Sequence, residues 1–102
     1  MRQMRIILMY DIYDDNSRES NSFRTNLIKN GYYMIQYSIY VKVIPSYSQY
    51  SSEKQKISKF LPKSANVRLI LLSEKQYQEI ELIKGNYSKN EIINNCGRYI
   101  KL

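Results

Sequence analysis

Residues 5–16 read Arg-Ile-Ile-Leu-Met-Tyr-Asp-Ile-Tyr-Asp-Asp-Asn, and this stretch decides the fold. Its apolar part, Ile6 to Tyr10, is short, continuous and followed by turn-forming residues, which is typical of a strand covered on both faces. Asp11 stands where that strand is expected to reach the surface. Because chemistry in helix-covered sheets tends to sit at strand ends and in the loops beyond them, Asp11 is the first candidate functional residue.

Two roles fit Asp11. Aspartate is common in turns and at helix N-caps, and the local pattern taken alone favours such a structural role. Alternatively, an aspartate at a strand end can bind a hard cation such as Mg²⁺, which needs one or two carboxylates together with water and substrate phosphates.

The composition is that of one folded domain spanning residues 1–102. This length allows one modest core, and the hydrophobic (43%) and charged (25%) contents are ordinary for a soluble protein. No apolar run approaches the ~18 residues that cross a bilayer, and no signal peptide is recognisable, so we expect a cytoplasmic protein without membrane contact.

Cysteine and histidine usage limits the chemistry. The single cysteine, Cys96, excludes an internal disulfide and is expected to be inert, because the chain has no histidine to activate it. The absence of histidine also removes Ser-His and Cys-His nucleophiles and histidine-bound zinc. An enzyme built on this chain must therefore use carboxylates, tyrosine, lysine or a metal-bound water.

The net charge is +7, with a pI of about 9.5. A surface that neutralises several phosphates releases counterions, so this charge favours a nucleic-acid partner. The alternative is general solubility charge. The candidate nucleic-acid contacts lie on two expected helices and are Arg18, Arg24, Lys54, Lys56 and Lys59, although a solvated helix face explains each of them equally well.

The first half of the chain predicts a helix and a long or doubled strand. Residues 17–30 form the helix, with Asn16 and Glu19 spaced as a cap pair and Gly31 placed to end it. Its expected apolar stripe is Phe23, Leu27 and Ile28. Residues 32–44 alternate apolar and polar side chains over a length beyond that of a usual strand, so we expect a bend, bulge or split near 36–38.

The second half predicts shorter elements. A helix over about 49–61 ends at Pro62, and the dense apolar run 65–72 is expected to be a central strand. Ser73 and Gln76 form a capping box that opens a short helix. Further expectations are a short strand at 80–83, a loop over 85–95 and a last edge strand at 98–102.

The first elements run strand, helix, long or doubled strand, helix, strand. This order predicts an α+β fold of the ferredoxin-like type, βαββαβ, with an additional C-terminal strand. The open face of such a sheet needs a cover, and a second copy of the chain would supply it as an isologous homodimer. Residues 86–102 are expected to be a C-terminal extension that takes part in the dimer.

Several of these features together resemble the small CRISPR-associated adaptation protein, the nuclease-like subunit of the spacer-acquisition complex. The resemblance covers about Met4 to Lys84 and is most similar to the branch associated with type II systems; Met1 to Gln3 would then be an extension. It rests on segments 9–12, 14–15 and 31–32, the helix with Arg18 and Arg24, and segments 36–40, 67–72 and 73–77.

The resemblance implies a ferredoxin-like homodimer with metal-dependent phosphodiester hydrolysis on RNA or DNA, an activity that some members lack. It implies that Asp11, which matches the family's aspartate, approaches its symmetry mate and shares a Mg²⁺, or alternatively Mn²⁺. This raises the metal-binding role of Asp11 above the structural one. It further implies a bridge between two dimers of a larger integrase subunit, with duplex DNA laid across it.

Three functions remain open from the sequence. The first is a Mg²⁺-dependent endonuclease that uses paired Asp11 residues. The second is a DNA-binding scaffold for the integrase without catalysis. The third is a stand-alone, toxin-like ribonuclease of the same fold. An RNA-binding sheet of the RRM type fits poorly, because the strand at 67–72 lacks the aromatic pattern that stacks on bases.

Overall fold

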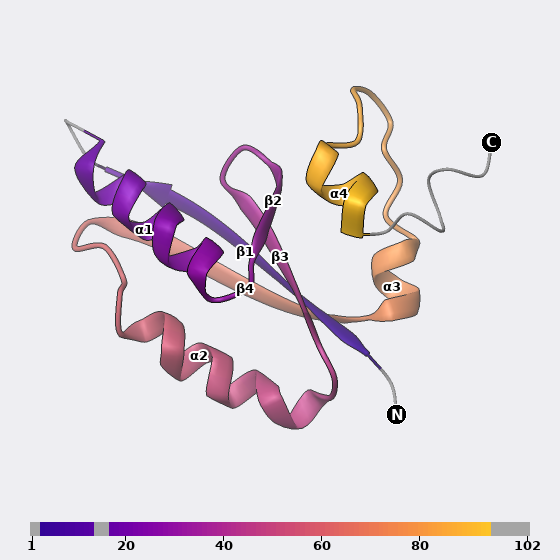
Figure 1. The fold of residues 1–102 in the computed structure, drawn as a ribbon, viewed down its shortest axis with the longest axis horizontal. Coiled ribbons are helices and arrows are strands. Elements are labelled where there is room, and N and C mark those ends of the chain that lie inside the picture. Colours follow the sequence, from indigo (N-terminus) through magenta and orange to yellow (C-terminus); the bar gives the residue numbers. More distant parts are fainter. Residues whose placement is uncertain (1–2, 14–16, 95–102) are drawn as a thin grey trace.

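The computed structural model describes residues 3–13 and 17–94. Figure 1 shows the order of the elements. They are β1 (Met4–Ile12), α1 (Arg18–Lys29), β2 (Tyr33–Gln36), β3 (Ile39–Ile44), the 3-10 turn η1 (Tyr47–Gln49), α2 (Tyr50–Ser58), β4 (Ala65–Ser73), α3 (Glu74–Gln78) and α4 (Lys89–Asn94).

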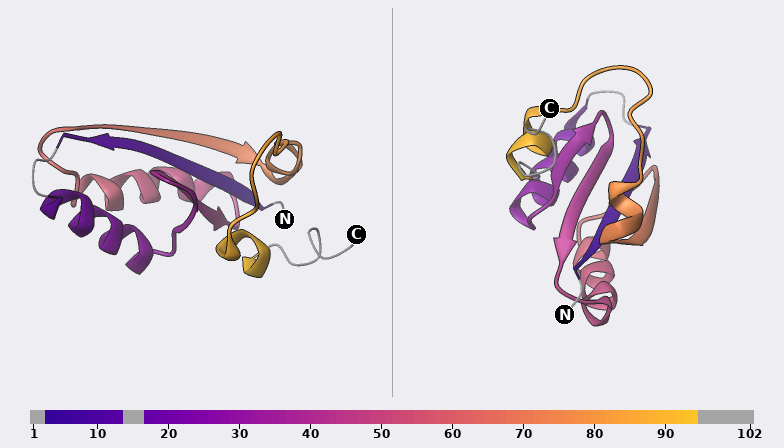
Figure 2. Two further views of the ribbon diagram at one scale, coloured as in Figure 1. Left: turned by 90° about the horizontal axis from the view of Figure 1, so that it is seen from above. Right: turned by 90° about the vertical axis from the view of Figure 1, so that its right-hand side faces the viewer.

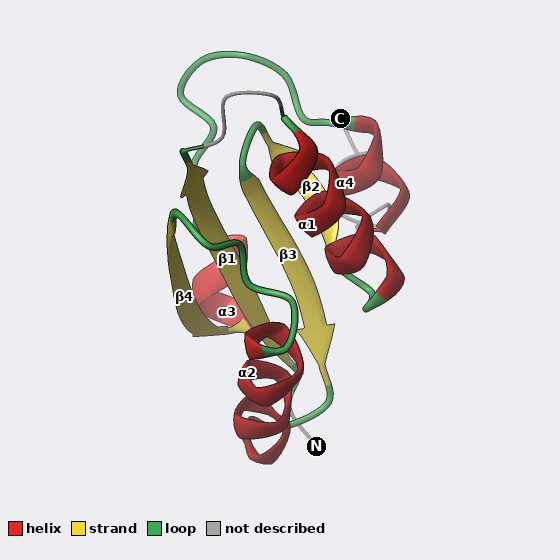
Figure 3. Ribbon diagram, turned by 90° about the vertical axis from the view of Figure 1, so that its left-hand side faces the viewer, coloured by secondary structure: helices red, strands yellow, loops and turns green. Residues whose placement is uncertain are grey.

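The four strands form one antiparallel sheet in the order β2-β3-β1-β4. Helices α1 and α2 lie on the same face of the sheet, which Figures 2 and 3 show as a layer of strands against a layer of helices. This order and layering confirm the ferredoxin-like α+β fold. The first strand is central, since it pairs with β3 on one side and β4 on the other.

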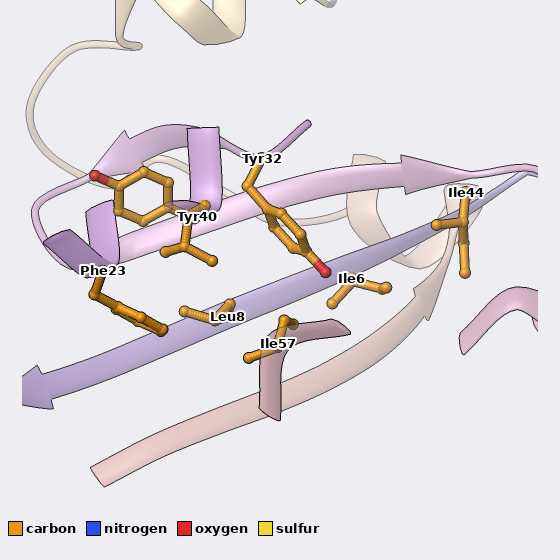
Figure 4. Packing of buried hydrophobic residues seen from close by; sticks show 8 residues of the cluster. Ile6, Leu8, Phe23, Tyr32, Tyr40, Ile44 and Ile57 are labelled. Atoms are coloured by element: carbon orange, nitrogen blue, oxygen red, sulfur yellow. The ribbon is translucent and has the colours of Figure 1, made fainter. Parts of the chain in front are cut away.

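The main core lies between the sheet and the two helices. Ile6 and Leu8 of β1 point toward the helices and are fully buried, since side chains two apart on a strand share a face. Figure 4 shows how aromatic and aliphatic side chains of α1, α2 and β3 surround them. The buried members of this cluster are Ile6, Leu8, Phe23, Leu27, Tyr32, Tyr40, Ile44 and Ile57.

The opposite face of the sheet, here called the open face, carries the alternate residues of the same strands. Ile7 and Val41 form a smaller apolar cluster there with Tyr77 of α3. Helix α3 therefore covers one part of the open face, whereas Ile70 of β4 remains 43% exposed.

Two of the expected turns are confirmed. Gly31 follows α1 with a φ of +93°, the left-handed conformation that a helix-ending residue needs. The long strand is split into β2 and β3 by a turn at Tyr37 and Ser38, where Ser38 has a φ of +65°. The expected stripe of α1 is only partly right, because Phe23 and Leu27 are buried but Ile28 is 54% exposed.

The observed helix ends agree only in part with those predicted from the sequence. The capping box of α3 is confirmed, since Gln76 N–H donates to Ser73 Oγ and Ser73 N–H to Gln76 Oε1. The cap position of α1 is wrong, because Ser17 directly precedes the helix. Helix α2 ends at Ser58, so the expected end at Pro62 is also too late.

Three expectations about the second half are wrong. The strand β4 lies at an edge of the sheet rather than in its centre. Residues 80–83 form no strand, and the expected loop at 85–95 contains α4. The expected edge strand at 98–102, Cys96 and the acidic turn at 14–15 lie outside the described residues. In the described part of the chain no helix is long and apolar enough to cross a membrane.

Candidate metal and nucleic-acid site

Asp11 lies near the end of β1, opposite Asn66 of the edge strand β4. Its neighbours Tyr10 and Ile12 pack against the main core, so Asp11 stands on the open face of the sheet. Its side chain is exposed to solvent. A carboxylate in this place is accessible to a cation or a substrate from the side that α1 and α2 leave uncovered.

A shallow depression of about 180 Å³ surrounds Asp11 and is lined by Met9, Tyr10, Asn66 and Arg68. The antiparallel register explains this grouping. Met9 pairs with Arg68 and Asp11 with Asn66, so these four residues occupy neighbouring positions on the same two strands.

Asn66 is held in place by a neighbour from the end of β1. Its side-chain amide donates to the Tyr13 hydroxyl at 2.7 Å, and the backbone N–H of Tyr13 donates to the Ser64 carbonyl at 2.9 Å. The loop before β4 is thereby tied to the segment that follows Asp11.

Arg68 and Asn66 were missed in the sequence. The signal that would have found them is the alternation of β4, in which Asn66 and Arg68 interleave with Val67 and Leu69, residues that pack toward the helices. Polar residues two apart mark one face of a strand. That face lies beside Asp11 only because β4 pairs with β1, and this pairing cannot be read from the sequence.

The depression offers few oxygen atoms that could bind a hard cation. Within residues 3–13 and 17–94, no group of three or more Asp, Glu, Cys or His side chains could hold a metal. Asp11, an exposed carboxylate, and Asn66, an amide, are the candidate oxygen ligands among the residues that line the depression. These oxygens fit Mg²⁺, which is often held by one or two carboxylates with water and substrate phosphates completing its shell.

The hydroxyl of Tyr10 does not add a base to this region. Burial, followed by the neighbouring Tyr40, raises the pKa of Tyr10 to about 12. The hydroxyl therefore stays protonated at neutral pH, and its ring stacks with Tyr40 and meets Phe23 edge-on in the core. We assign Tyr10 to packing.

The five candidate nucleic-acid contacts lie away from Asp11, on the helix layer. Arg18 and Arg24 are exposed on α1, and Lys54 and Lys56 on α2, while Lys59 directly follows α2. The fold thus brings them onto one side of the molecule but separates them from Asp11 by the sheet.

Two of the lysines also have partners within the protein. Lys56 lies 3.5 Å from the carboxylate of Glu53, and the ammonium of Lys54 lies 4.8 Å from the centre of the Tyr50 ring. Glu53 is itself buried. Its carboxylate also forms an ion pair with the Lys42 ammonium at 2.8 Å and accepts a hydrogen bond from the Tyr32 hydroxyl at 3.2 Å. The Lys56 side chain is therefore exposed to solvent but also contacts the Glu53 carboxylate within the protein.

The family model described as CRISPR associated protein Cas2 matches residues 4–80, most of the chain. The chain belongs to this family. The resemblance to the small CRISPR-associated adaptation protein is thereby confirmed.

Similar Cas2 proteins support this assignment. The CRISPR-associated endoribonuclease Cas2 of Campylobacter jejuni is 38% identical over 95 residues, which cover 90% of this chain and 66% of the relative. That of Ligilactobacillus salivarius is 35% identical over 102 residues, which cover 97% of this chain and 100% of the relative. This chain thus spans the whole length of the second relative and slightly less than two thirds of the first.

A crystal structure of a Cas2 protein has the same fold, with a TM-score of 0.59 over 85% of this chain and 92% of the other. Its sequence is 18% identical, so the likeness concerns the fold. It agrees with the ferredoxin-like order of the strands.

Proposed function

We propose that this chain is a Mg²⁺-dependent endonuclease that acts as a homodimer in CRISPR adaptation, with Asp11 of each copy as the metal ligand. The position of Asp11 carries the proposal, because it is an exposed carboxylate at a strand end, beside an arginine and an asparagine. The relatives from C. jejuni and L. salivarius are described as endoribonucleases, which favours a phosphodiester substrate.

A homodimer is supported by the open face. Ile70 is 43% exposed on it, whereas Ile7 and Val41 are buried in the cluster with Tyr77, and β4 has a free edge among the described strands. A second copy applied to this face would cover Ile70 and bring a second Asp11 toward the first. Two carboxylates repel each other unless a cation lies between them, so the pair needs a bound metal.

The proposed reaction adds water across a phosphodiester, leaving a phosphate on one fragment and a hydroxyl on the other. A bound Mg²⁺ supplies charge stabilisation at the phosphate and lowers the pKa of a coordinated water. The contribution of the chain is to hold the cation through Asp11. No general base is supplied by Tyr10, whose hydroxyl stays protonated.

Replacement of Asp11 by asparagine tests the proposal. We expect D11N to lose Mg²⁺-dependent cleavage of RNA and DNA oligonucleotides by at least about a hundredfold, because several kcal/mol of charge stabilisation depend on the metal. The matched control is E81Q, which removes an exposed carboxylate in the segment after α3. Equal cleavage by D11N and wild type would end the endonuclease proposal.

The same dimer is proposed to carry duplex DNA on its helix layer and to bridge dimers of a larger integrase subunit. The exposed cations of α1 and α2 support the DNA part, since phosphate contacts need charge and little base specificity. The double variant R18Q/R24Q should weaken duplex binding and leave D11-dependent cleavage of short oligonucleotides intact. If binding is unchanged, these two arginines are not the contacts.

The catalysis-free scaffold and the stand-alone ribonuclease are distinguished by two further measurements. A scaffold binds duplex DNA and co-elutes with the integrase subunit but shows no D11-dependent cleavage. A stand-alone ribonuclease cleaves RNA but not DNA and does not associate with that subunit.

A further inference from the structure

We propose that Arg68 is the phosphate-binding residue of the Asp11 site. Its guanidinium would donate hydrogen bonds to the non-bridging oxygens of the phosphodiester that the Asp11 site cleaves. The inference deepens the proposed endonuclease function and rests on it for its biological meaning. The placement of Arg68 does not depend on that function.

The geometry begins with the β1–β4 register. Arg68 pairs with Met9, and Asn66 pairs with Asp11, so Arg68 and Asp11 are diagonal neighbours across the strand pair. Diagonal neighbours on one face lie about 7–8 Å apart, within reach of a long side chain. Both residues line the same depression, and both are exposed.

Elimination of the other strand cations strengthens the assignment. Arg5 shares the open face, but its side chain is 95% buried and its guanidinium donates two hydrogen bonds to Glu74, at 2.8 and 2.9 Å. Lys42 pairs with Ile6 and binds Glu53 at 2.8 Å on the helix side. Arg68 takes part in no ion pair among the described residues, so it is the strand cation available to an anion.

The helix cations cannot replace Arg68. Arg18, Arg24 and the lysines of α2 belong to the helix layer, which Figure 2 shows on one face of the sheet, whereas Asp11 stands on the open face. Arg68 is the cation among the residues that line the depression around Asp11.

The chemistry of arginine fits the role. A guanidinium presents a planar fork of donors that matches two phosphate oxygens, and it stays charged at every relevant pH. It also offsets the negative charge of Asp11, which would otherwise repel a phosphodiester. Because the contact is to phosphate rather than to a base or a 2′-hydroxyl, we expect the site to accept RNA and DNA of any sequence.

The binding test uses a short dinucleoside monophosphate as the probe and needs no metal. Binding is measured from the backbone amide signals of two-dimensional NMR spectra in wild type, D11N, R68A and R68K, and the Nε–H signal of Arg68 is followed in wild type and D11N. The matched control is K29A, because Lys29 is an exposed cation of α1 on the helix layer. We expect the Arg68 signal to shift in wild type and D11N, and R68K to bind about tenfold to a hundredfold more weakly, because a charge-assisted bidentate contact is lost. K29A should bind as wild type does.

The activity test separates the two proposals. In Mg²⁺, R68A should lower kcat/KM by about tenfold to a thousandfold, and R68K should recover only part of it. If wild type cleaves nothing but the probe still shifts Arg68, the endonuclease proposal fails and the phosphate site stands. If R68A and R68K bind the probe and cleave as wild type does, the assignment of Arg68 is wrong.

Discussion

At the scale of single residues, Arg5 and Glu74 connect the beginning of the sheet to α3. Arg5 is 4% exposed, donates to the Tyr33 hydroxyl at 2.9 Å and lies 4.2 Å from the centre of the Tyr77 ring. Gln78 donates to Glu74 as well, at 2.6 Å. This cluster fixes α3 over one part of the open face and leaves the part around Asp11 clear.

Glu74 should make stability depend on pH. Burial by itself raises the pKa of Glu74, but hydrogen bonds from Arg5 and Gln78 outweigh it and hold the pKa below its usual value. A depressed carboxyl pKa stabilises the fold at pH above the unfolded value of about 4.3, and that contribution disappears as pH falls through the folded value.

We therefore expect E74Q to cost about 1.5–3 kcal/mol at pH 7, the range for hydrogen bonds to a charged group, and nearer its lower end because Glu74 is partly exposed. The difference from wild type should shrink below about pH 4. Urea unfolding at pH 7 and pH 3.5 measures it, with E79Q as the exposed control. A difference that is the same at both pH values would contradict the pKa argument.

The residues of the candidate site show what a sequence can and cannot reveal. Asp11 was found because an acid that ends an apolar run is a local signal. Arg68 and Asn66 lie more than fifty residues further along the chain, and their polar character on β4 is equally typical of a solvated strand face. Their relation to Asp11 exists only through the strand register.

At the scale of elements, α4 illustrates a signal that was present in the sequence. Ser88 Oγ accepts from the Glu91 backbone N–H at 3.1 Å, and Glu91 accepts from the Ser88 backbone N–H at 2.7 Å. This is a capping box, Ser-x-x-Glu, in a segment otherwise rich in asparagine. The Ser88 hydroxyl also donates to the Met34 carbonyl at 3.3 Å, which ties α4 to the edge strand β2.

Replacement of Ser88 by alanine should loosen α4 without unfolding the domain. The loss of an N-cap costs about 1 kcal/mol of helix stability. This loss should matter in α4, because short helices are only marginally stable. We expect faster amide hydrogen exchange at residues 91–94 and unchanged exchange in β1. S46A is the control, since Ser46 makes no side-chain cap bond at η1. Unchanged exchange in α4 would show that its contacts with β2, rather than the cap, hold it.

The elements predicted well are those with a strong local period or turn signal. The strand β1, the split between β2 and β3, the turn at Gly31 and the capping box of α3 all belong to this group. The edge position of β4 was not predictable from apolar density, because α2 and the core require apolar side chains on one face of an edge strand as well. The stretch 80–83 has strand-like composition but no strand partner among the described residues.

At the scale of the whole molecule, the sheet divides the surface into two parts of different character. The helix layer carries the exposed cations of α1 and α2. The open face carries Asp11, Arg68 and apolar side chains such as Ile70. A dimer formed through the open face would place the proposed chemistry at its centre and leave both helix layers free for duplex DNA.

This arrangement predicts that Ile70→Glu breaks the dimer. A charge placed in an apolar interface must be desolvated without a partner, which costs several kcal/mol and opposes association. We expect I70E to be monomeric by light scattering at concentrations at which wild type is dimeric, and to lose the cleavage that paired Asp11 residues support. The matched control is I28E, since Ile28 is also about half exposed (54%) but lies on α1 in the helix layer. I28E should remain dimeric and active. If I70E also remains dimeric while I28E dissociates, the two copies associate through their helices, and the two Asp11 side chains cannot share a metal.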